Sequence, residues 1–269
     1  MHLIWKKFSI ALAFVAATAA VAVTTAAQAQ NKDYTPSVGQ EGKDVIWVPT
    51  PNELIQKMLD MAKLTPSDYH VDLGSGDGRT VIAAAKRGSR ALGVEYNPDM
   101  VELSKRNAQK EGVSARAEFI RADIFETDFS KANVLTLYLL PSLNLKLRPT
   151  ILNMKPGTRV VSHAFTMGDW QADQTETVEG RTAYLWIVPA KVDGHWRVEG
   201  GGDLALKQTF QKLEGSSGGK AISNAALHGD AISFSADGRD YSGKVTGDHI
   251  EGTLKSSGKE ARWSATRLK

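Results

Sequence analysis

The chain has 269 residues, of which 42% are hydrophobic and 23% are charged, values typical of a globular protein with an apolar core. It contains no cysteine, which excludes disulfide bonds, a thiol nucleophile and cysteine-ligated zinc. The formal net charge is +3, from 33 basic and 30 acidic residues, so charge gives no support for a nucleic-acid-binding role.

The first 29 residues have the composition of a secretory signal peptide. Lys6 and Lys7 precede an uncharged stretch rich in alanine and valine, which ends in Ala27-Gln28-Ala29. Cleavage there removes two basic residues and leaves 31 against 30 acidic ones, a net charge of +1. We therefore expect export to the periplasm or the cell envelope, with no stable membrane span after cleavage. The alternative is an uncleaved N-terminal membrane anchor, because the segment is long enough to cross a bilayer.

The next segment leads into the first predicted helix. Residues 30–44 are polar and contain two glycines, which favours a flexible leader. The run Thr50-Pro51-Asn52-Glu53 matches a capping box, in which Thr50 is the N-cap of the helix. Apolar residues at helical spacing follow between Leu54 and Ala62, and predict a helix that lies on a sheet.

A strand followed by a glycine-rich turn stands next in the chain. Residues 69–73 predict a buried strand, the run from Gly74 to Gly78 a turn, and residues 79–87 a helix that ends before Gly88. Glycines at such a turn let the backbone approach a ligand, and the N-terminus of the helix directs free N–H groups to the same place. Glu95 ends the following strand, where a doubly wound fold carries the carboxylate that binds a ribose. Together these features predict a cofactor that contains a nucleoside.

Strands and helices continue to alternate as far as about residue 190. This order predicts an α/β domain over residues 45–190, with a doubly wound, mostly parallel sheet covered on both faces. The expected strands are 91–95, 117–121, 133–139, 158–163 and 182–189, and the expected helices are 97–112 and 142–154. From residue 194 onward, short alternating runs are separated by turns such as Gly229-Asp230 and Gly247-Asp248, which predicts a separate antiparallel β-meander over 194–269.

The glycine spacing distinguishes between two kinds of nucleoside cofactor. The NAD fingerprint requires a third glycine at the position of Arg79, whereas this chain has Gly74, Gly76 and Gly78. The run Asp72-Leu73-Gly74-Ser75-Gly76-Asp77-Gly78 instead resembles motif I of the class I methyltransferases that depend on S-adenosylmethionine. Glu95-Tyr96-Asn97-Pro98 and Arg121-Ala122-Asp123-Ile124-Phe125 resemble the next two motifs of that family.

This resemblance implies S-adenosylmethionine as the cofactor, with a loop that wraps its methionine portion. It implies that Glu95 accepts from both ribose hydroxyls, that Asp123 accepts from the adenine amine and that Ile124 packs on the ring. Each role has a structural alternative: a turn or helix cap for Asp77, a surface carboxylate for Glu95 and a turn residue for Asp123. The cofactor-binding residues expected from the resemblance are Asp72, Gly74, Ser75, Gly76, Asp77, Glu95, Asp123 and Ile124.

The end of the fourth strand of the α/β domain is the expected place for the methyl acceptor. Relatives that methylate amino groups of bases carry an N-P-P-Y motif there, but this chain has Tyr138-Leu139-Leu140-Pro141, with neither an amide nor a carboxylate. This departure argues against a nucleic-acid substrate. Candidate catalytic residues are Tyr138, with a core aromatic as the alternative, and His163, with a structural role as the alternative. Candidate substrate contacts are Thr50, Leu139 and Pro141, and the six scattered histidines predict no metal site.

Three segments together resemble one branch of the family. Val48-Pro49-Thr50, Val71–Arg79 and Tyr138–Asn144 are similar to the bacterial relatives of the mitochondrial protein-lysine methyltransferases that act on a subunit of ATP synthase and similar targets. This resemblance covers about residues 45–190 and implies a protein lysine as acceptor. Two alternatives stay open: a methyltransferase of the same fold acting on a small molecule, and an exported protein that keeps the fold for binding alone. The sequence carries no signal for an oligomeric state.

Overall fold

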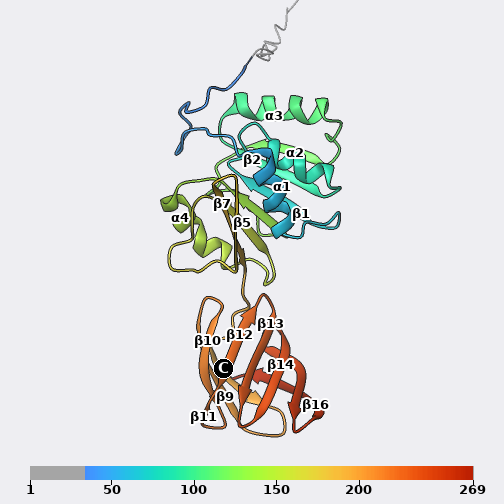
Figure 1. The fold of residues 1–269 in the computed structure, drawn as a ribbon, viewed down its shortest axis with the longest axis vertical. Coiled ribbons are helices and arrows are strands. Elements are labelled where there is room, and N and C mark those ends of the chain that lie inside the picture. The colour runs from blue at the N-terminus through green and yellow to red at the C-terminus, as the bar shows by residue number, and fades with distance from the viewer. Residues whose placement is uncertain (1–33, 269) are drawn as a thin grey trace, which may run out of the picture. The chain divides into compact units, whose positions relative to one another are not determined.

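The computed structural model describes residues 34–268, and the predicted signal peptide lies outside this range. The N-terminal domain is built on a seven-stranded sheet of order β3-β2-β1-β4-β5-β7-β6 (Figure 1). Its first five strands are parallel: β1 (Tyr69–Leu73), β2 (Arg90–Glu95), β3 (Ala117–Arg121), β4 (Val134–Leu137) and β5 (Arg159–His163). The helices are α1 (Asn52–Met61), α2 (Arg79–Lys86), α3 (Pro98–Lys110) and α4 (Pro141–Ile151).

Helices cover both faces of this sheet, as the sequence predicts. Neighbouring strand residues point to opposite faces, so Val134 packs with α1 whereas Leu135 packs with α4. Apolar side chains of α2 and α3 bury the same face as α1, around Phe119 of β3. The doubly wound α/β class is therefore confirmed.

Two strands at one end of the sheet run antiparallel. β7 (Arg181–Ile187) pairs with β5, and β6 (Gln174–Val178) pairs with β7 at the sheet edge. The sequence predicts β7 as residues 182–189 but gives no sign of β6. The reason is that β6 has the sequence Gln-Thr-Glu-Thr-Val, in which no residue is fully buried, so it lacks the apolar alternation that marks a strand.

The predicted capping box is wrong. Helix α1 begins one residue later, with Pro51 at its N-cap position and no side chain capping it. The hydroxyl of Thr50 instead forms a hydrogen bond of 3.1 Å with Nδ1 of His163, at the end of β5. Thr50 therefore links the start of α1 to the sheet rather than capping the helix.

The segment before α1 forms a backbone-paired hairpin, although the sequence suggests only a flexible leader. The amide of Trp47 donates to Gln40, and the amide of Gly39 donates to Trp47, each at 2.9 Å. Glu41 and Ile46 form an isolated antiparallel bridge next to these bonds, toward the tip of the hairpin. Residues 39–47 are called the leader hairpin below.

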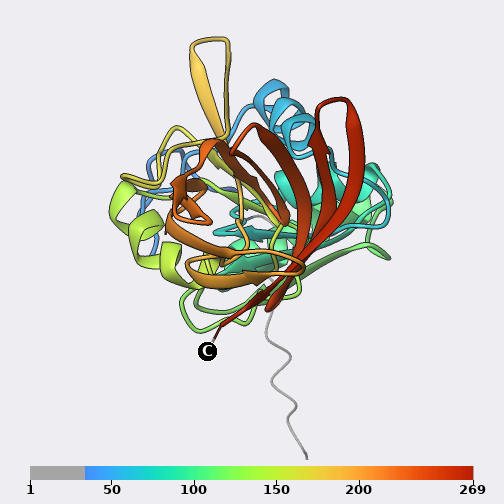
Figure 2. The same ribbon diagram turned by 90° about the horizontal axis from the view of Figure 1, so that it is seen from below.

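The C-terminal part of the chain is an antiparallel sheet of nine strands. Their order is β11-β10-β9-β8-β16-β15-β14-β13-β12, and Figure 2 shows how the strands curve round. The backbone bond from Ile222 to Gly215 joins the two ends, so the sheet is nearly a barrel. Its interior is packed with apolar side chains, including the contacting rings of Phe234, Tyr241 and Trp263. The strands are β8 (Gly194–Val198), β9 (Asp203–Thr209), β10 (Lys212–Ser217), β11 (Lys220–Ala221), β12 (Ser223–His228), β13 (Ala231–Ala236), β14 (Arg239–Thr246), β15 (His249–Ser256) and β16 (Lys259–Arg267).

The antiparallel C-terminal sheet expected from the sequence is thus present, and its two Gly-Asp pairs form the turns before β13 and β15. Among residues 34–268, no helix is both long and apolar enough to cross a membrane.

Candidate functional site

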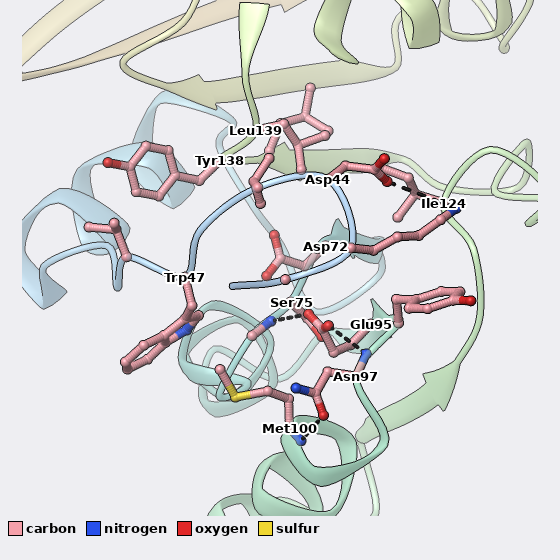
Figure 3. Close-up of a pocket in the computed structure, with 18 of the residues that line it drawn as sticks. Asp44, Trp47, Asp72, Ser75, Glu95, Asn97, Met100, Ile124, Tyr138 and Leu139 are labelled. Carbon is pink, nitrogen blue, oxygen red and sulfur yellow. Dashed lines mark hydrogen bonds and ion pairs between the residues drawn. The ribbon is translucent and has the colours of Figure 1, made fainter. Parts of the chain in front are cut away.

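A cavity of about 270 Å³ lies where the carboxyl ends of β1, β2 and β4 meet the leader hairpin. In an open α/β sheet, ligands bind at this edge of the strands. Figure 3 shows side chains from these segments directed into one space. All of the expected cofactor-binding residues line the cavity: Asp72, Gly74, Ser75, Gly76, Asp77, Glu95, Asp123 and Ile124.

The glycine-rich turn has the backbone conformation that the sequence predicts. Gly76 has a φ of +54°, and a Cβ atom at this residue would lie 2.7 Å from Nε1 of Trp47 in the leader hairpin. Gly78 has a φ of +82°, and a Cβ atom there would lie 2.8 Å from the side chain of Ser104 on α3. Glycine at these positions therefore lets the turn fit between the leader hairpin and α3.

Glu95 links the glycine-rich turn after β1 to the turn after β2. Its two carboxylate oxygens accept hydrogen bonds of 2.9 Å from the amides of Gly76 and Asn97 (Figure 3). Burial raises the pKa of Glu95, and the backbone N–H donors partly oppose this rise. Each oxygen retains a second lone pair, so the same carboxylate is able to accept from hydroxyl groups in the cavity.

Asp72 is the most deeply placed carboxylate of the cavity. It is 6% exposed, and the hydroxyl of Thr136 on β4 donates to its Oδ1 atom at 2.6 Å. Burial raises the pKa of Asp72 to about 7, and the neighbouring charges of Glu95 and Asp77 act in the same direction. A cation that enters the cavity would favour its ionised form.

Asp123 already has a cationic partner within the chain. Lys43 of the leader hairpin forms an ion pair with its Oδ2 atom, and the ammonium lies 4.9 Å from the centre of the Tyr96 ring. The hydrogen bond from Lys43 holds the pKa of Asp123 below its ordinary value, and the Phe125 amide acts in the same direction. Ile124, the next residue in the chain after Asp123, is half-buried and also lines the cavity.

Asp77 is also paired. Its Oδ2 atom accepts from Nη2 of Arg79 at 2.6 Å, and Arg79 also donates to the backbone carbonyl of Thr50 at 3.2 Å. The helix-cap alternative for Asp77 holds in part: Gly78 is the N-cap residue of α2, but Oδ1 of Asp77 accepts from the backbone amide of Arg79, the first residue of the helix, at 3.3 Å. Through the Arg79 side chain, Asp77 also joins the turn to the start of α1.

At the end of β4, apolar and aromatic side chains form another part of the cavity wall. The Tyr138 ring lies against that of His163, tilted by 30° with 3.8 Å between ring centres, and is stacked with the Phe165 ring at 6.2 Å. Leu139 would come within 3.1 Å of a Cβ atom on Gly74, so it packs against the glycine turn. Of the expected acceptor-site residues, Thr50, Tyr138 and Leu139 line the cavity.

Two of the expected acceptor-site residues do not line the cavity. His163 is 1% exposed, and burial, together with the charge of Arg181, lowers its pKa to about 4. It is therefore placed to support Tyr138 and Thr50 from behind rather than to meet a substrate. Pro141 begins α4 and is exposed outside the cavity wall.

A buried asparagine holds the loop that carries Phe165. The amide nitrogen of Asn144 on α4 donates to the carbonyls of Phe165 and Thr166, each at 3.3 Å. Ala164, in the same loop, has a φ of +65°, a conformation that a non-glycine residue rarely adopts. The loop is thus held in one conformation beside Tyr138.

The sequence gives no indication that the leader hairpin forms one wall of the cavity. Trp47, Lys43 and Asp44 all line it, as does every residue from Gln40 to Thr50. These residues show no helical or strand periodicity, because they pair through backbone bonds in a short hairpin. The one available signal is the short apolar run Val45-Ile46-Trp47-Val48, which stands between the polar leader and the first helix.

The charges of the cavity suit a cationic ligand. Six carboxylate side chains line it, against Lys43 and Arg79 as the basic ones: Glu41, Asp44, Asp72, Asp77, Glu95 and Asp123. S-adenosylmethionine carries a sulfonium and an ammonium group, so an acidic cavity with a glycine turn fits it. Among residues 34–268 there is no cluster of three or more His, Cys, Asp or Glu side chains that would hold a metal ion.

Comparison with known proteins gives the chain its family. The family described as the ANTKMT methyltransferase domain matches residues 72–174. A protein-lysine N-methyltransferase of Saccharolobus islandicus is 40% identical over 151 residues, which cover 54% of this chain and 94% of that protein. A human lysine N-methyltransferase, named for its action on an ATP synthase subunit, is 34% identical over 135 residues, or 50% of this chain and 57% of the human one.

A solved structure agrees with these relatives in fold. It is a Salinibacter ruber protein described as an RNA methyltransferase in complex with S-adenosyl-L-homocysteine, with a TM-score of 0.53 and 48% identity. The similarity covers 54% of this chain and 96% of that one. The chain therefore belongs to the family of S-adenosylmethionine-dependent methyltransferases that contains the ANTKMT methyltransferase domain.

Proposed function

We propose that this methyltransferase transfers a methyl group to the side-chain amine of a protein lysine. The observation that carries the proposal is the wall at the end of β4, where Tyr138, Leu139 and Phe165 line the cavity. This wall offers aromatic and apolar contact to an aliphatic chain and its amine, but no amide or carboxylate that would hold the edge of a base. The naming of the archaeal and human relatives as lysine methyltransferases supports the same acceptor.

The cofactor-binding residues have distinct proposed roles. Asp72 holds the ammonium of the amino-acid portion, and the turn from Gly74 to Asp77 surrounds that portion. Glu95 accepts from the ribose hydroxyls. Asp123 accepts from the adenine amine, once Lys43 releases it, and Ile124 packs on the ring. The resemblance of these segments to the family motifs supports these roles, as do the position of each group on the cavity wall and its hydrogen-bonding chemistry.

Bound S-adenosylmethionine supplies an electrophilic methyl group on a sulfonium. The chain's own residues must align the lysine amine with it and exclude water, because in-line displacement depends chiefly on positioning. The amine must arrive unprotonated, and an apolar wall lowers the pKa of a lysine placed against it. No histidine occurs among the described residues of the cavity wall, which fits a reaction that uses no dedicated base.

The test is transfer of a radiolabelled methyl group from S-adenosylmethionine to three fractions of one cell extract: protein, RNA and small molecules. The expected product is methyl-lysine, identified after acid hydrolysis of the protein fraction. Label confined to small molecules would favour the alternative small-molecule enzyme. Label confined to RNA would match the description of the Salinibacter protein and overturn the lysine proposal.

We also propose that the chain is exported and cleaved after Ala29. The support is the sequence alone, since residues 1–29 lie outside the described range. N-terminal sequencing of the protein from a bacterial envelope fraction is expected to begin at Gln30. An intact N-terminus in that fraction would support an anchor instead.

A further inference from the structure

Three polar side chains form a continuous hydrogen-bonded row beneath the cavity. His70 and Asp72 lie two residues apart on β1, so their side chains share one face, and Thr136 on β4 pairs with Asp72. Nε2 of His70 lies 2.8 Å from the Thr136 hydroxyl, which lies 2.6 Å from Oδ1 of Asp72. His70 and Thr136 are both fully buried.

The chemistry of these groups fixes the direction of the row. When Asp72 is ionised, the form that would bind a cation, the Thr136 hydroxyl donates its one proton to that carboxylate, so it must accept from His70. His70 therefore carries its proton on Nε2, and Nδ1 has no partner among the described residues. Burial lowers the pKa of His70 to about 3, which keeps the ring neutral at physiological pH.

Only one end of the row reaches the cavity. Asp72 lines the cavity wall, whereas neither Thr136 nor His70 does. Oδ1 of Asp72 is bound to Thr136, and its other oxygen has no hydrogen-bond partner among residues 34–268. Each oxygen of Glu95, by contrast, already accepts from a backbone amide, so Asp72 is the more deeply buried carboxylate and the one with an oxygen that accepts no hydrogen bond.

Packing alone does not require these residue types. A valine would fill the position of Thr136 on a central strand, and burying a hydroxyl and an imidazole costs free energy unless each finds a partner. The row satisfies that need while it fixes the rotation of the Asp72 carboxylate. Thr136 and His70 thus fix the orientation of the Asp72 carboxylate, which apolar side chains in their place could not do.

We propose that Thr136 and His70 are positioning residues that turn the free oxygen of Asp72 toward the amino-acid ammonium of the cofactor. This inference rests on the proposed function, because it requires S-adenosylmethionine in this cavity. It adds two buried residues to the binding of the cofactor's amino-acid portion, and neither of them touches the ligand.

The test compares two ligands that differ in the amino-acid portion. S-adenosylhomocysteine carries that portion, and 5′-deoxy-5′-methylthioadenosine has the same nucleoside and thioether without it. Calorimetric titration of Thr136→Val is expected to show affinity for the first ligand falling about tenfold or more, because a charged hydrogen bond loses its alignment. Affinity for the second ligand is expected to change by less than about twofold. Thr136→Ser should restore the first affinity.

The matched control is Thr158→Val, which alters another buried threonine that does not line the cavity. If Thr136→Val weakens both ligands equally, or neither, the positioning role is overturned. If the unaltered protein binds neither ligand, the proposed function itself fails and this inference with it.

A second measurement uses the unaltered chain and therefore does not depend on whether a variant folds. Nitrogen-15 NMR of the histidine rings at about pH 8, where Asp72 is ionised, should show His70 as the neutral tautomer with its proton on Nε2. A proton on Nδ1 would contradict the row of hydrogen bonds, since Thr136 would then have no donor from His70.

Discussion

Lys43 in the leader hairpin forms an ion pair with Asp123, a residue 80 positions later that follows β3. This pair occupies the carboxylate that we propose for the adenine amine. On this proposal the ligand and Lys43 compete for one acceptor, so Lys43 is expected to weaken cofactor binding.

Lys43→Met is expected to raise the affinity for S-adenosylmethionine by about two- to fivefold, because an ion pair this exposed is weak. Titration calorimetry at low salt measures the change. Lys57→Met, which removes an exposed pair with Glu176, serves as the control. A fall in affinity for Lys43→Met would show that the lysine contacts the cofactor instead of competing with it.

Glu95→Ala is expected to abolish detectable binding of S-adenosylmethionine and to lower the free energy of unfolding by about 2–4 kcal/mol. The stability loss arises because the amides of Gly76 and Asn97 lose a charged acceptor. Urea denaturation and calorimetry measure the two effects. Glu118→Ala, which changes an exposed carboxylate on β3, should affect neither. Normal binding by Glu95→Ala would remove Glu95 from the site.

The stability of the ligand-free protein is expected to depend on the ionisation of Asp72. Its pKa is about 7 in the folded protein and near 3.8 in the unfolded chain, so the folded protein holds an extra proton between about pH 4 and 7. The stabilising effect of this proton is complete below the unfolded value and is lost as the pH rises through 7. The loss is at most about 1.4 kcal/mol per pH unit. Urea denaturation of Asp72→Asn between about pH 4 and 7 should show a free energy of unfolding without this pH-dependent loss.

Cofactor binding should show the opposite pH dependence. The ligand's ammonium favours the ionised form of Asp72, so affinity for S-adenosylmethionine is expected to rise by about tenfold between pH 6 and 8. The charged groups that act on Asp72 are Glu95 and Asp77, and His70 stays neutral throughout. Calorimetry in buffers of different ionisation enthalpy would detect the released proton. A flat profile would mean that Asp72 does not meet the cation.

Tyr138→Ala is expected to reduce the rate of methyl transfer at least about tenfold and to change cofactor affinity less than about threefold. The reason is that its ring forms part of the proposed acceptor wall, beside Phe165, and is not among the groups proposed to hold the cofactor. Single-turnover kinetics and calorimetry separate the two effects. Tyr184→Ala, at a partly buried tyrosine outside the cavity, is the matched control. An equal loss of cofactor affinity would place Tyr138 in the cofactor site.

Local sequence signals predict the parts of the site that local chemistry builds. The glycine turn after β1 is recognisable because positive φ angles and close backbone approach demand glycine at fixed positions. Glu95 and Asp123 follow because the ends of adjacent parallel strands meet at one edge. These features need no knowledge of distant contacts.

Distant contacts decide what the sequence leaves out or predicts wrongly. Thr50 has the residue type and spacing of a helix cap, but its hydroxyl binds His163, 113 residues away. The Asp72–Thr136 bond spans 64 residues and likewise leaves no local pattern. β6 is recognisable only through its pairing with β7, since its residues are polar and at the sheet edge.

The contact between Trp47 and the glycine turn places an intrinsic fluorophore at the cavity. The structure describes five tryptophans; Trp47 is the half-buried one on the cavity wall, while Trp170, Trp186, Trp196 and Trp263 are buried elsewhere. An adenosine ligand that enters beside this indole should quench its fluorescence. The decrease in tryptophan fluorescence would then report cofactor binding in real time, and Trp47→Phe is expected to abolish that decrease.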